Sequence, residues 1–497
     1  MNDAHNMQKV VDEHALKLSA DELRALLEGV ISAPKGEHPE RWMALVPGAQ
    51  TAAHSDLQRL KDEVAEGSAW GFESQPAPAS RLDALRQELA KRSVDGFLIP
   101  RGDEFHNEYP PRRADRLEWL TGFNGSAGLA AVLPDEAAVF VDGRYTLQAS
   151  QQVDSERFVL RHLTESPIDQ WILECAKPGQ SLAVDPWLHT QAELAPVVRA
   201  CEARGVKLVK LDSNPIDAIW DGQPAAPIAP LRVHPVERAG MGVAEKRRQI
   251  AELLAESGAQ ATVVTATDSV AWLTNCRGGD LPHTPAFLAT AILTEEGSLT
   301  VFVDPRKLTD EVRSHLEGVE LRAISEFSEA LGAIQADRVL LDEHMTPVAV
   351  IDRVRDAGAT PVLARDPVML PKARKNSAEL KGSREAHRRD GAAVTRFLHW
   401  LGENASSHQL GELEAARKLH EIRREDPLFE DLSFETITGA GPNGAIIHYR
   451  ATAASERILE QNSLYLVDSG AQYLDGTTDI TRTVAIGEPT AEHRERF

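Results

Sequence analysis

Hydrophobic and polar positions change their period several times along the chain, and each change predicts a different kind of element. Residues 80–100, "SRLDALRQELAKRSVDGFLIP", begin with the apolar spacing of an amphipathic helix and end in a short apolar strand. Residues 127–145, "AGLAAVLPDEAAVFVDGRY", contain two strand-like runs around a turn, which predicts a hairpin. Residues 236–304 repeat this order of helix, strand and hairpin. The pattern is typical of α/β domains.

Two short sequences recur inside these passages, in the same order. "WLT" occurs at 119–121 and again at 272–274, and "FVD" occurs at 140–142 and again at 302–304. One match of three residues could arise by chance. Two matches in the same structural context predict that the chain holds two related α/β domains in tandem.

Proline-rich segments separate the regions of the chain. "DGQPAAPIAPLRVHP" reads as a linker after the first α/β domain, and "RDPVMLPKARKNS" as a break after the second. We therefore predict an N-terminal extension, a first domain, a second domain and a third region, with the bounds 1–75, 76–232, 233–368 and 369–497.

The extension has helical spacing but no candidate chemistry. "SADELRALLEGVIS" predicts a helix with Ser19 as its N-cap and Glu22 at the capping-box position. "SDLQRLKDEVAEG" predicts a second helix that ends at a glycine. The expected structure is a small helical pair or a semi-ordered arm.

The third region has a different order of predicted elements. A long helix is predicted over 377–404, and a further helix follows with Ser406 and Ser407 as cap candidates. Strand-like runs come next, namely "FETITG", "GAIIHYRA", "SLYLVDSGAQ" and "TTDITRTVAI". Helices followed by a meander of strands indicate an α+β layer.

Composition excludes several classes of function. The formal net charge of −22 over 497 residues argues against nucleic acid or an anionic membrane surface as a partner. The three cysteines are far apart and lack a CxxC pair, which argues against a disulfide framework or a zinc site. No signal peptide and no apolar run near the ~20 residues of a membrane span is present. A cytoplasmic location is expected.

One motif match is misleading. "GAGPNG" at 439–444 has the letters of a dinucleotide-binding GxGxxG loop. That loop requires a helix directly after it, so that phosphates meet the helix N-terminus. Here the strand-like "AIIHYRA" follows. A tight loop that passes close to a substrate is the better interpretation.

Two aspartates occupy strand-like sequence around an Asp-Gly pair. Asp468 shares its parity with Leu464 and Leu466, so a carboxylate follows apolar side chains on one face. Asp479 lies on the returning strand. Burying such carboxylates is costly unless they are paired, hydrogen-bonded or bound to a metal. The alternative is that both are ordinary hairpin residues.

The register of this hairpin decides whether the two aspartates meet. A two-residue turn at Asp475 and Gly476 would leave the carboxylates roughly 13 Å apart along the strand. A four-residue loop over 472–475 would place Asp468 directly opposite Asp479, with Cβ atoms ~5 Å apart. Facing carboxylates repel each other unless cations lie between them, and the residues alone leave the choice between the two loops open. His448, in a predicted strand just upstream, adds a possible third polar group.

Several of these motifs together resemble the aminopeptidase P (Xaa-Pro aminopeptidase) family in its long, three-domain form. The resemblance runs from about Ser80 to Phe497. It is carried by "RLEWLTGFNGSAGLAAVL", "FVDGRYTLQA", "VDPWLHT", "AWLTNCRGGDLPHTPAFLATAIL", "REAHRRDGAAVTRFLHWL", "SFETITGAGPNGAIIHY" and "YLVDSGAQYLDGTTDITRT". It implies two creatinase-like N-terminal domains, then a pita-bread catalytic domain with a dinuclear metal site, and a homodimer.

The resemblance also implies roles for particular residues. Asp468 and Asp479, with the family's spacing of 11, take two of five metal-ligand positions, and this implied metal site predicts the longer loop over 472–475. His448 takes the position that holds the substrate and stabilises the tetrahedral intermediate. The implied metals are two divalent ions, Mn²⁺ first, with Zn²⁺ or Co²⁺ as alternatives. The implied reaction releases the N-terminal residue from peptides with proline second, through a metal-bridging hydroxide.

One part of the family pattern is absent from this sequence. The remaining ligands, a histidine and two glutamates, lie downstream of the "TTDITRT" segment in the family, and no upstream residue occupies their motifs. We interpret the sequence as a fragment of a longer protein; the alternative is a split or degenerate protein that cannot bind two metals alone. Two rival functions stay open: a prolidase-like dipeptidase, and a catalytically inactive module that binds peptides or proteins. Retention of Asp468, Asp479 and His448 counts against the second rival.

Overall fold

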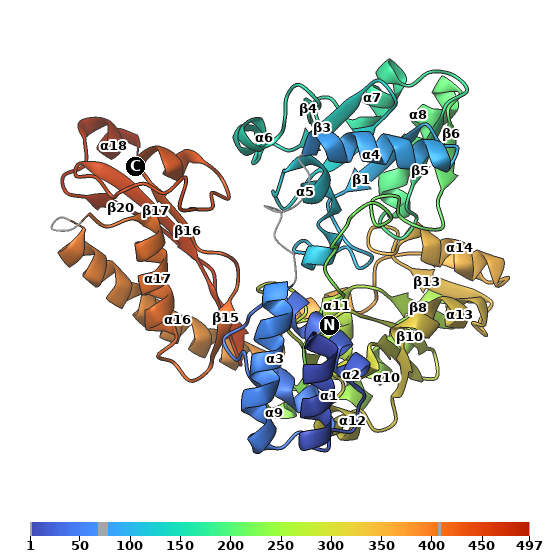
Figure 1. The fold of residues 1–497 in the computed structure, drawn as a ribbon, viewed down its shortest axis with the longest axis horizontal. Coiled ribbons are helices and arrows are strands. Elements are labelled where there is room, and N and C mark those ends of the chain that lie inside the picture. The colour runs from blue at the N-terminus through green and yellow to red at the C-terminus, as the bar shows by residue number, and fades with distance from the viewer. Residues whose placement is uncertain (1, 68–77, 406–408, 497) are drawn as a thin grey trace.

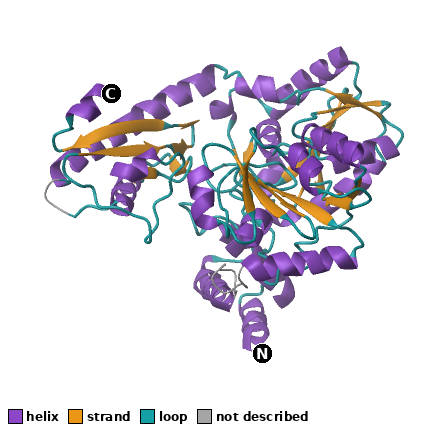
Figure 2. Ribbon diagram, turned by 90° about the horizontal axis from the view of Figure 1, so that it is seen from above, coloured by secondary structure: helices purple, strands orange, loops and turns teal. Residues whose placement is uncertain are grey.

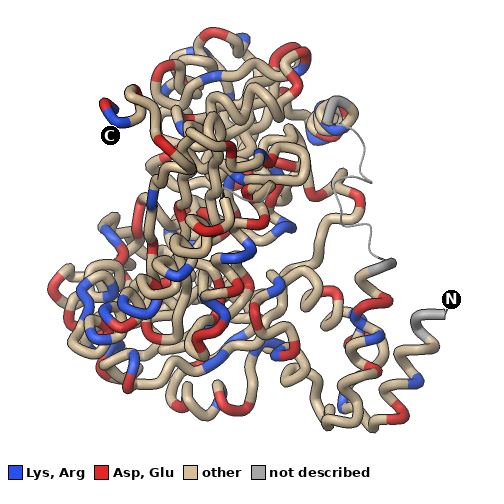
Figure 3. Tube along the Cα trace, turned by 90° about the vertical axis from the view of Figure 1, so that its left-hand side faces the viewer, with Lys and Arg blue, Asp and Glu red and all other residues tan. Residues whose placement is uncertain are grey.

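The computed structural model describes residues 2–67, 78–405 and 409–496. Three helices at the N-terminus lie beside two α/β units, and the third region, coloured orange to red, lies to their left (Figure 1). Helices cover the strands of each α/β unit (Figure 2). Acidic and basic segments are interspersed along the trace (Figure 3). Within the described ranges, no helix combines the length and apolar character needed to cross a bilayer.

The N-terminal extension is a packed unit of three helices, which goes beyond the pair or arm we expected. Its elements are α1 (Asn2–Glu13), α2 (Ala20–Ser32), η1 (Arg41–Leu45), η2 (Thr51–Ala53) and α3 (His54–Gly67). The predicted capping box is confirmed, because the Ser19 side chain accepts from the Glu22 backbone and Glu22 accepts from the Ser19 backbone. Leucines of α2 and α3 form a core that Ile228 of the linker completes.

The first α/β domain contains a six-stranded sheet in the order β4-β3-β2-β1-β5-β6. Strand β2 runs antiparallel to its two neighbours, β1 and β3, and the other neighbouring pairs are parallel. Its elements are α4 (Pro78–Lys91), β1 (Gly96–Pro100), η4 (Arg112–Ala114), α5 (Arg116–Thr121), β2 (Leu129–Val132), β3 (Ala137–Val141), α6 (Thr146–Gln152), β4 (Val159–His162), α7 (Ile168–Cys175), β5 (Ser181–Val184), α8 (Gln191–Arg204) and β6 (Lys207–Lys210).

The second α/β domain repeats this topology, with the order β12-β11-β10-β8-β13-β14. "WLT" ends helix α5 in one domain and helix α11 in the other, and "FVD" ends strands β3 and β11, so the tandem relation predicted from the repeats is seen in the fold. The elements are β7 (Arg232–Val233), α9 (Val236–Ala239), α10 (Val243–Ser257), β8 (Ala261–Val264), α11 (Thr267–Thr274), β9 (Cys276–Arg277), β10 (Ala289–Thr294), β11 (Leu299–Val303), η5 (Pro305–Lys307), α12 (Asp310–His315), β12 (Glu320–Ala323), η6 (Ile324–Glu326), α13 (Phe327–Gly332), β13 (Arg338–Leu341), α14 (Val348–Asp356) and β14 (Thr360–Leu363).

The third region packs two helices against two three-stranded sheets, β15-β18-β19 and β16-β17-β20. Its elements are α15 (Met369–Ala373), α16 (Ser377–Asn404), α17 (Glu412–Arg423), β15 (Phe429–Leu432), β16 (Ile437–Ala440), η7 (Gly441–Ala445), β17 (Ser463–Ser469), β18 (Ala471–Tyr473), β19 (Gly476–Thr477), β20 (Ile480–Ile486) and α18 (Ala491–Arg496). The cap candidates Ser406 and Ser407 lie outside the described residues.

The predicted strand "GAIIHYRA" is wrong. The 3₁₀ helix η7 occupies residues up to Ala445, and a turn follows that contains His448. The chain folds back here because Gly439 and Gly444 touch: a Cβ on Gly439 would lie 2.6 Å from the Gly444 Cα. That approach is open only to glycine, so the backbone leaves the sheet at this point.

The predicted loop of the aspartate hairpin is also wrong. Gln472 pairs with Thr477 and Tyr473 with Gly476, so the turn consists of Leu474 and Asp475 alone. Packing against α16 sets this turn, because the Asp475 carbonyl lies against Gly382 and a Cβ on Gly476 would lie 2.9 Å from the Ala386 Cβ. Neither of the two loops we considered has this register.

Ion pairs join the extension to the third region. Arg41 Nη1 lies 2.8 Å from Glu430 Oε2, and Arg232 of β7 also binds Glu430. A second contact is made by Glu37 of the extension. Its carboxylate oxygens lie 2.7 Å from His420 Nε2 and 2.7 Å from Arg424 Nε of the third region. Ion pairs of two acidic side chains, Glu37 and Glu430, therefore join the extension to the third region.

Candidate active site

Asp468 and Asp479 are diagonal neighbours in the hairpin. Asp468 pairs with Thr481 and Ser469 with Ile480, and this register sets Asp479 opposite Gly470. Burial is the main cause that raises the pKa of Asp479, followed by the charge of Asp468 and a hydrogen bond with it. Thr481 Oγ1 donates to Asp468 Oδ1 at 2.7 Å. The two carboxylates thus lie close enough to interact, although they do not face each other as we predicted.

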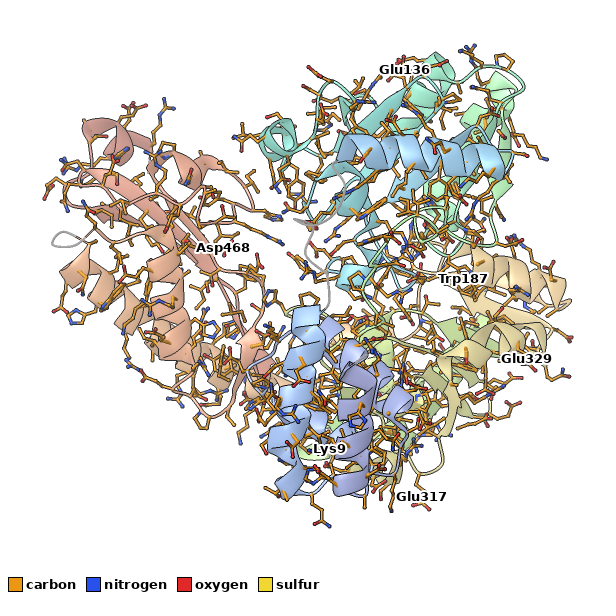
Figure 4. The ribbon with its side chains drawn as sticks, viewed as in Figure 1. Lys9, Glu136, Trp187, Glu317, Glu329 and Asp468 are labelled. Carbon is orange, nitrogen blue, oxygen red and sulfur yellow. The ribbon has the colours of Figure 1, made fainter. Side chains whose placement is uncertain are left out.

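The buried face of β17 is the opposite of the one we expected. Tyr465, Val467 and Ser469 are buried, whereas Asp468 shares the half-buried face with Leu464 and Leu466. Tyr465 and Val467 pack into the core of the third region. Asp468, labelled in Figure 4 on the central strands, therefore faces a partly open space and avoids the full cost of burial.

Both aspartates line a cavity of about 310 Å³ between the third region and the first α/β domain. The third region contributes His448, Glu435 and Arg450 as well. The first domain contributes polar residues of three segments, among them Glu108, Asn124, Ser126, Tyr145 and Gln148. The cavity exists only where the two parts of the chain meet.

His448 is held by the first domain. Its Nδ1 lies 2.8 Å from the Tyr145 hydroxyl, and the two rings meet edge to face at 5.7 Å between centroids. The backbone of His448 has φ 56°, a left-handed conformation that is uncommon for residues other than glycine. Of the three residues predicted for the site, the structure thus brings all three to one cavity.

Comparison with known protein families covers most of the chain. Residues 81–219 and 222–379 each match a creatinase/prolidase N-terminal domain family, and residues 381–497 match metallopeptidase family M24. A probable Xaa-Pro aminopeptidase P of Aspergillus niger is 36% identical over 435 residues, which are 84% of this chain and 70% of that protein. A second, from Coccidioides posadasii, is 38% identical over 433 residues, 84% of this chain and 66% of that protein.

The fold matches a solved structure as well. An X-prolyl aminopeptidase from Caenorhabditis elegans, described as a cytosolic enzyme with a di-nuclear active site, aligns with a TM-score of 0.79 and 30% identity. The alignment covers 84% of this chain and 71% of that one.

The chain belongs to the Xaa-Pro aminopeptidase P family. The predicted fold class is confirmed: two creatinase-like domains precede the M24 pita-bread domain, here represented by residues 381–497. M24 is a metallopeptidase family, so the chain belongs to a family of hydrolases. The family and its di-nuclear neighbour indicate two divalent metal ions.

The carboxylate pair of this family member fits such ions. Both side chains offer oxygen donors, which hard divalent ions prefer. Burial and the neighbouring Asp468 carboxylate raise the pKa of Asp479. Among the described residues, no basic side chain lowers that pKa in return. Two neighbouring carboxylates without such a partner repel each other, and bound cations would remove that repulsion.

Two other features of the family member are weaker candidates for a site. A larger cavity of about 750 Å³ lies between the extension, the linker and β15, but neither aspartate nor His448 lines it. Its lining carries charges of both signs, such as Lys35, Arg41 and Glu311. Glu13, His14 and Asp56 form a potential metal cluster on the extension, where a 3.0 Å contact between His14 and Asp56 accounts for two of the three.

Sequence reasoning missed the contribution of the first creatinase-like domain. "FVDGRY" stood out as a repeat and as part of the family resemblance, but no role was assigned to its last residue, Tyr145, which reaches into the site. A signal was present, since the second repeat reads "FVDPRK" and differs at that position. A difference between repeats of one fold marks a residue that the fold itself does not require.

Proposed function

We propose that the protein is a metal-dependent aminopeptidase that releases the N-terminal residue from peptides with proline in second position. One observation carries this proposal: Asp468, Asp479 and His448 of an M24 domain line a single cavity. The names of the relatives, which are Xaa-Pro aminopeptidases, support the same substrate class.

Each group in the cavity has a separate task in this proposal. Asp468 and Asp479 hold divalent ions, and bound ions supply Lewis-acid polarisation of the scissile carbonyl and a water of lowered pKa. His448 contacts the substrate near that carbonyl. Four carboxylates line the cavity, of which Glu435 is paired with Arg450 at 3.2 Å. The acidic excess favours the ammonium group of a peptide N-terminus.

We propose manganese as the metal, with zinc or cobalt as substitutes. The ligands contributed here are carboxylate oxygens, which favour Mn²⁺ over softer ions. A histidine among the further ligands that the family resemblance implies would make Zn²⁺ or Co²⁺ acceptable.

We also propose the division of the protein into an extension (1–75), two creatinase-like domains (76–232 and 233–368) and a catalytic region (369–497). A homodimer and a cytoplasmic location complete the proposal. The first rests on the family resemblance, and the second is supported by the C. elegans relative, which is described as cytosolic.

Hydrolysis of Xaa-Pro peptides tests the proposed function. The protein translated from the full reading frame that contains these residues, loaded with Mn²⁺, is expected to cleave Xaa-Pro tripeptides and longer peptides. Asp479→Asn should lower kcat/KM by at least about a thousandfold and weaken Mn²⁺ binding, because it removes a charged ligand. Asp475→Asn is the matched control, since Asp475 lies in the turn of the same hairpin and pairs with Arg389 instead.

Three results would contradict parts of this proposal. Full activity of Asp479→Asn would exclude the metal site. Cleavage of Xaa-Pro dipeptides but not of longer peptides would select a prolidase instead. Tight peptide binding without hydrolysis by the metal-loaded protein would select an inactive binding module.

A further inference from the structure

A chain of hydrogen bonds crosses from the first creatinase-like domain to His448. The Tyr145 hydroxyl lies 2.8 Å from His448 Nδ1 and 2.8 Å from Ser126 Oγ. Ser126 Oγ donates in turn to Glu108 Oε1 at 3.0 Å. We propose that Tyr145 is a positioning residue for His448, so that the first creatinase-like domain sets the state of a group in the active site. The inference rests on the proposed function only in taking His448 to act on a peptide substrate.

The direction of the chain follows from its last member. A carboxylate has no proton to give, so Glu108 accepts and Ser126 donates its only hydroxyl proton to it. Ser126 must then accept the proton of Tyr145, and the Tyr145 oxygen must accept from His448 Nδ1. Neutral His448 therefore carries its proton on Nδ1, and its Nε2 is left as an acceptor.

This tautomer decides what His448 can do to a substrate. With the proton on Nδ1, neutral His448 accepts a hydrogen bond at Nε2, for example from a substrate amide or ammonium group. It donates at Nε2 only as the imidazolium. Without Tyr145, the ring would be free to take the other tautomer or to rotate.

Tyr145 is rigid enough to act in this way. It is 2% exposed, and its ring meets Phe123 edge to face at 5.6 Å between centroids. The Arg144 guanidinium lies over the same ring, 5.1 Å from its centroid. His448 itself has the left-handed φ of 56°, which a contact from outside its own turn helps to maintain.

The fold does not require a tyrosine at this position. In the second creatinase-like domain, the residue in the same place after "FVD" is Lys307, which pairs with Asp280 at 2.6 Å inside its own domain. Both of those side chains are almost fully buried. In the first domain this position is Tyr145, whose hydroxyl forms a hydrogen bond with His448 of the M24 domain.

The test removes the Tyr145 hydroxyl and nothing else. The protein from the full reading frame that contains these residues is labelled with ¹⁵N-histidine, and the His448 signals are assigned by their loss in His448→Gln. The parent is expected to show the Nδ1-protonated tautomer at His448. In Tyr145→Phe that preference should be lost, with the other histidine signals in place, which shows that the protein is folded.

Kinetics supply the second readout, on the Mn²⁺-loaded protein from the full reading frame. Tyr145→Phe should lower kcat about ten- to a hundredfold, the usual effect of removing a partner that orients an active-site group, with KM within about threefold of the parent. Ser126→Ala should show a smaller loss in the same direction. The control is Tyr465→Phe, which deletes a buried tyrosine hydroxyl on the core face of β17 that has no hydrogen-bond partner among the described residues, and it should leave kcat unchanged.

An unchanged kcat in Tyr145→Phe would overturn the inference, and so would an unchanged tautomer of His448. Failure of the proposed function is a separate result. If the parent cleaves no Xaa-Pro peptide, the tautomer measurement still decides whether Tyr145 controls His448, because it requires no turnover.

Discussion

The two creatinase-like domains share a scaffold and differ in what one turn of it does. In each domain a strand ends in "FVD", and the arginine two residues later folds back onto that aspartate. Arg144 Nη2 lies 2.7 Å from Asp142 Oδ2, and Arg306 Nη2 lies 2.6 Å from Asp304 Oδ2. In both cases the backbone N–H of the arginine also donates to the same carboxylate.

The next residue separates the two domains. In the second domain, the Lys307 side chain points into its own domain and forms a buried ion pair with Asp280. In the first domain, the Tyr145 side chain points out of the domain and forms a hydrogen bond with His448 of the M24 domain. One scaffold position thus carries a buried ion pair in one copy and a hydrogen bond to His448 in the other.

The largest expected effect is a loss of stability when the Lys307–Asp280 ion pair of the second domain is broken. Lys307→Met should destabilise the second domain by about 3–5 kcal/mol, since it leaves the buried Asp280 carboxylate without its partner. The free energy of unfolding of the whole chain, from denaturant titration, measures this. The same variant should keep the His448 tautomer. A cost below about 1 kcal/mol would show that the pair contributes little.

The cost of Lys307→Met should depend on pH. Burial raises the pKa of Asp280, and Lys307 opposes that shift, so its removal should raise the pKa further. A group whose pKa is raised on folding binds more protons in the folded state, and stability falls as pH rises through that range. The variant should therefore be closest to the parent at the acidic end of the pH range in which it is folded and furthest from it at the alkaline end. A cost independent of pH would mean that Asp280 stays charged.

A smaller effect is expected for the outward-facing copy. Tyr145→Phe should lower the free energy of unfolding by less than about 3 kcal/mol, the net contribution of its two hydrogen bonds with Ser126 and His448, while it changes the His448 tautomer. The same titration and the histidine spectrum measure the two quantities. Equal stability losses in Tyr145→Phe and Lys307→Met would remove the distinction between the copies.

The smallest effects should be those of the shared turn. Arg144→Ala and Arg306→Ala each remove a partly exposed ion pair and should each cost about 0.5–1 kcal/mol. Only Arg144 packs on the Tyr145 ring, so only Arg144→Ala should also lower kcat, by a few-fold. A loss of kcat in both variants would point to a general effect on stability.

The same distinction explains what the sequence could and could not predict. Patterns that depend on local structure gave the helices α2 and α16, the hairpins of both creatinase-like domains and their repetition, because period, capping and turn residues are local. The aspartate hairpin was identified, but its turn was not. The fit of Asp475 and Gly476 to α16 decides the register, and that contact lies about 90 residues away in sequence, between residues 382–386 and 475–476.

Other parts of the site were not accessible from local patterns. His448 was expected in a strand, whereas the contact of Gly439 with Gly444 turns the backbone away. Tyr145 was missed because its role appears only when two domains meet, 303 residues apart in sequence. The family resemblance supplied the roles of Asp468, Asp479 and His448, and these assignments stay predictions.

The central claim is that Asp468 and Asp479 hold metal in the cavity between the first creatinase-like domain and the M24 domain. Anomalous diffraction from crystals of the protein from the full reading frame, grown with Mn²⁺, tests it most directly. We predict anomalous peaks within ligand distance, about 2.0–2.6 Å, of both carboxylates, with the His448–Tyr145 contact intact beside them. Manganese bound elsewhere, with none at these two carboxylates, would contradict the account.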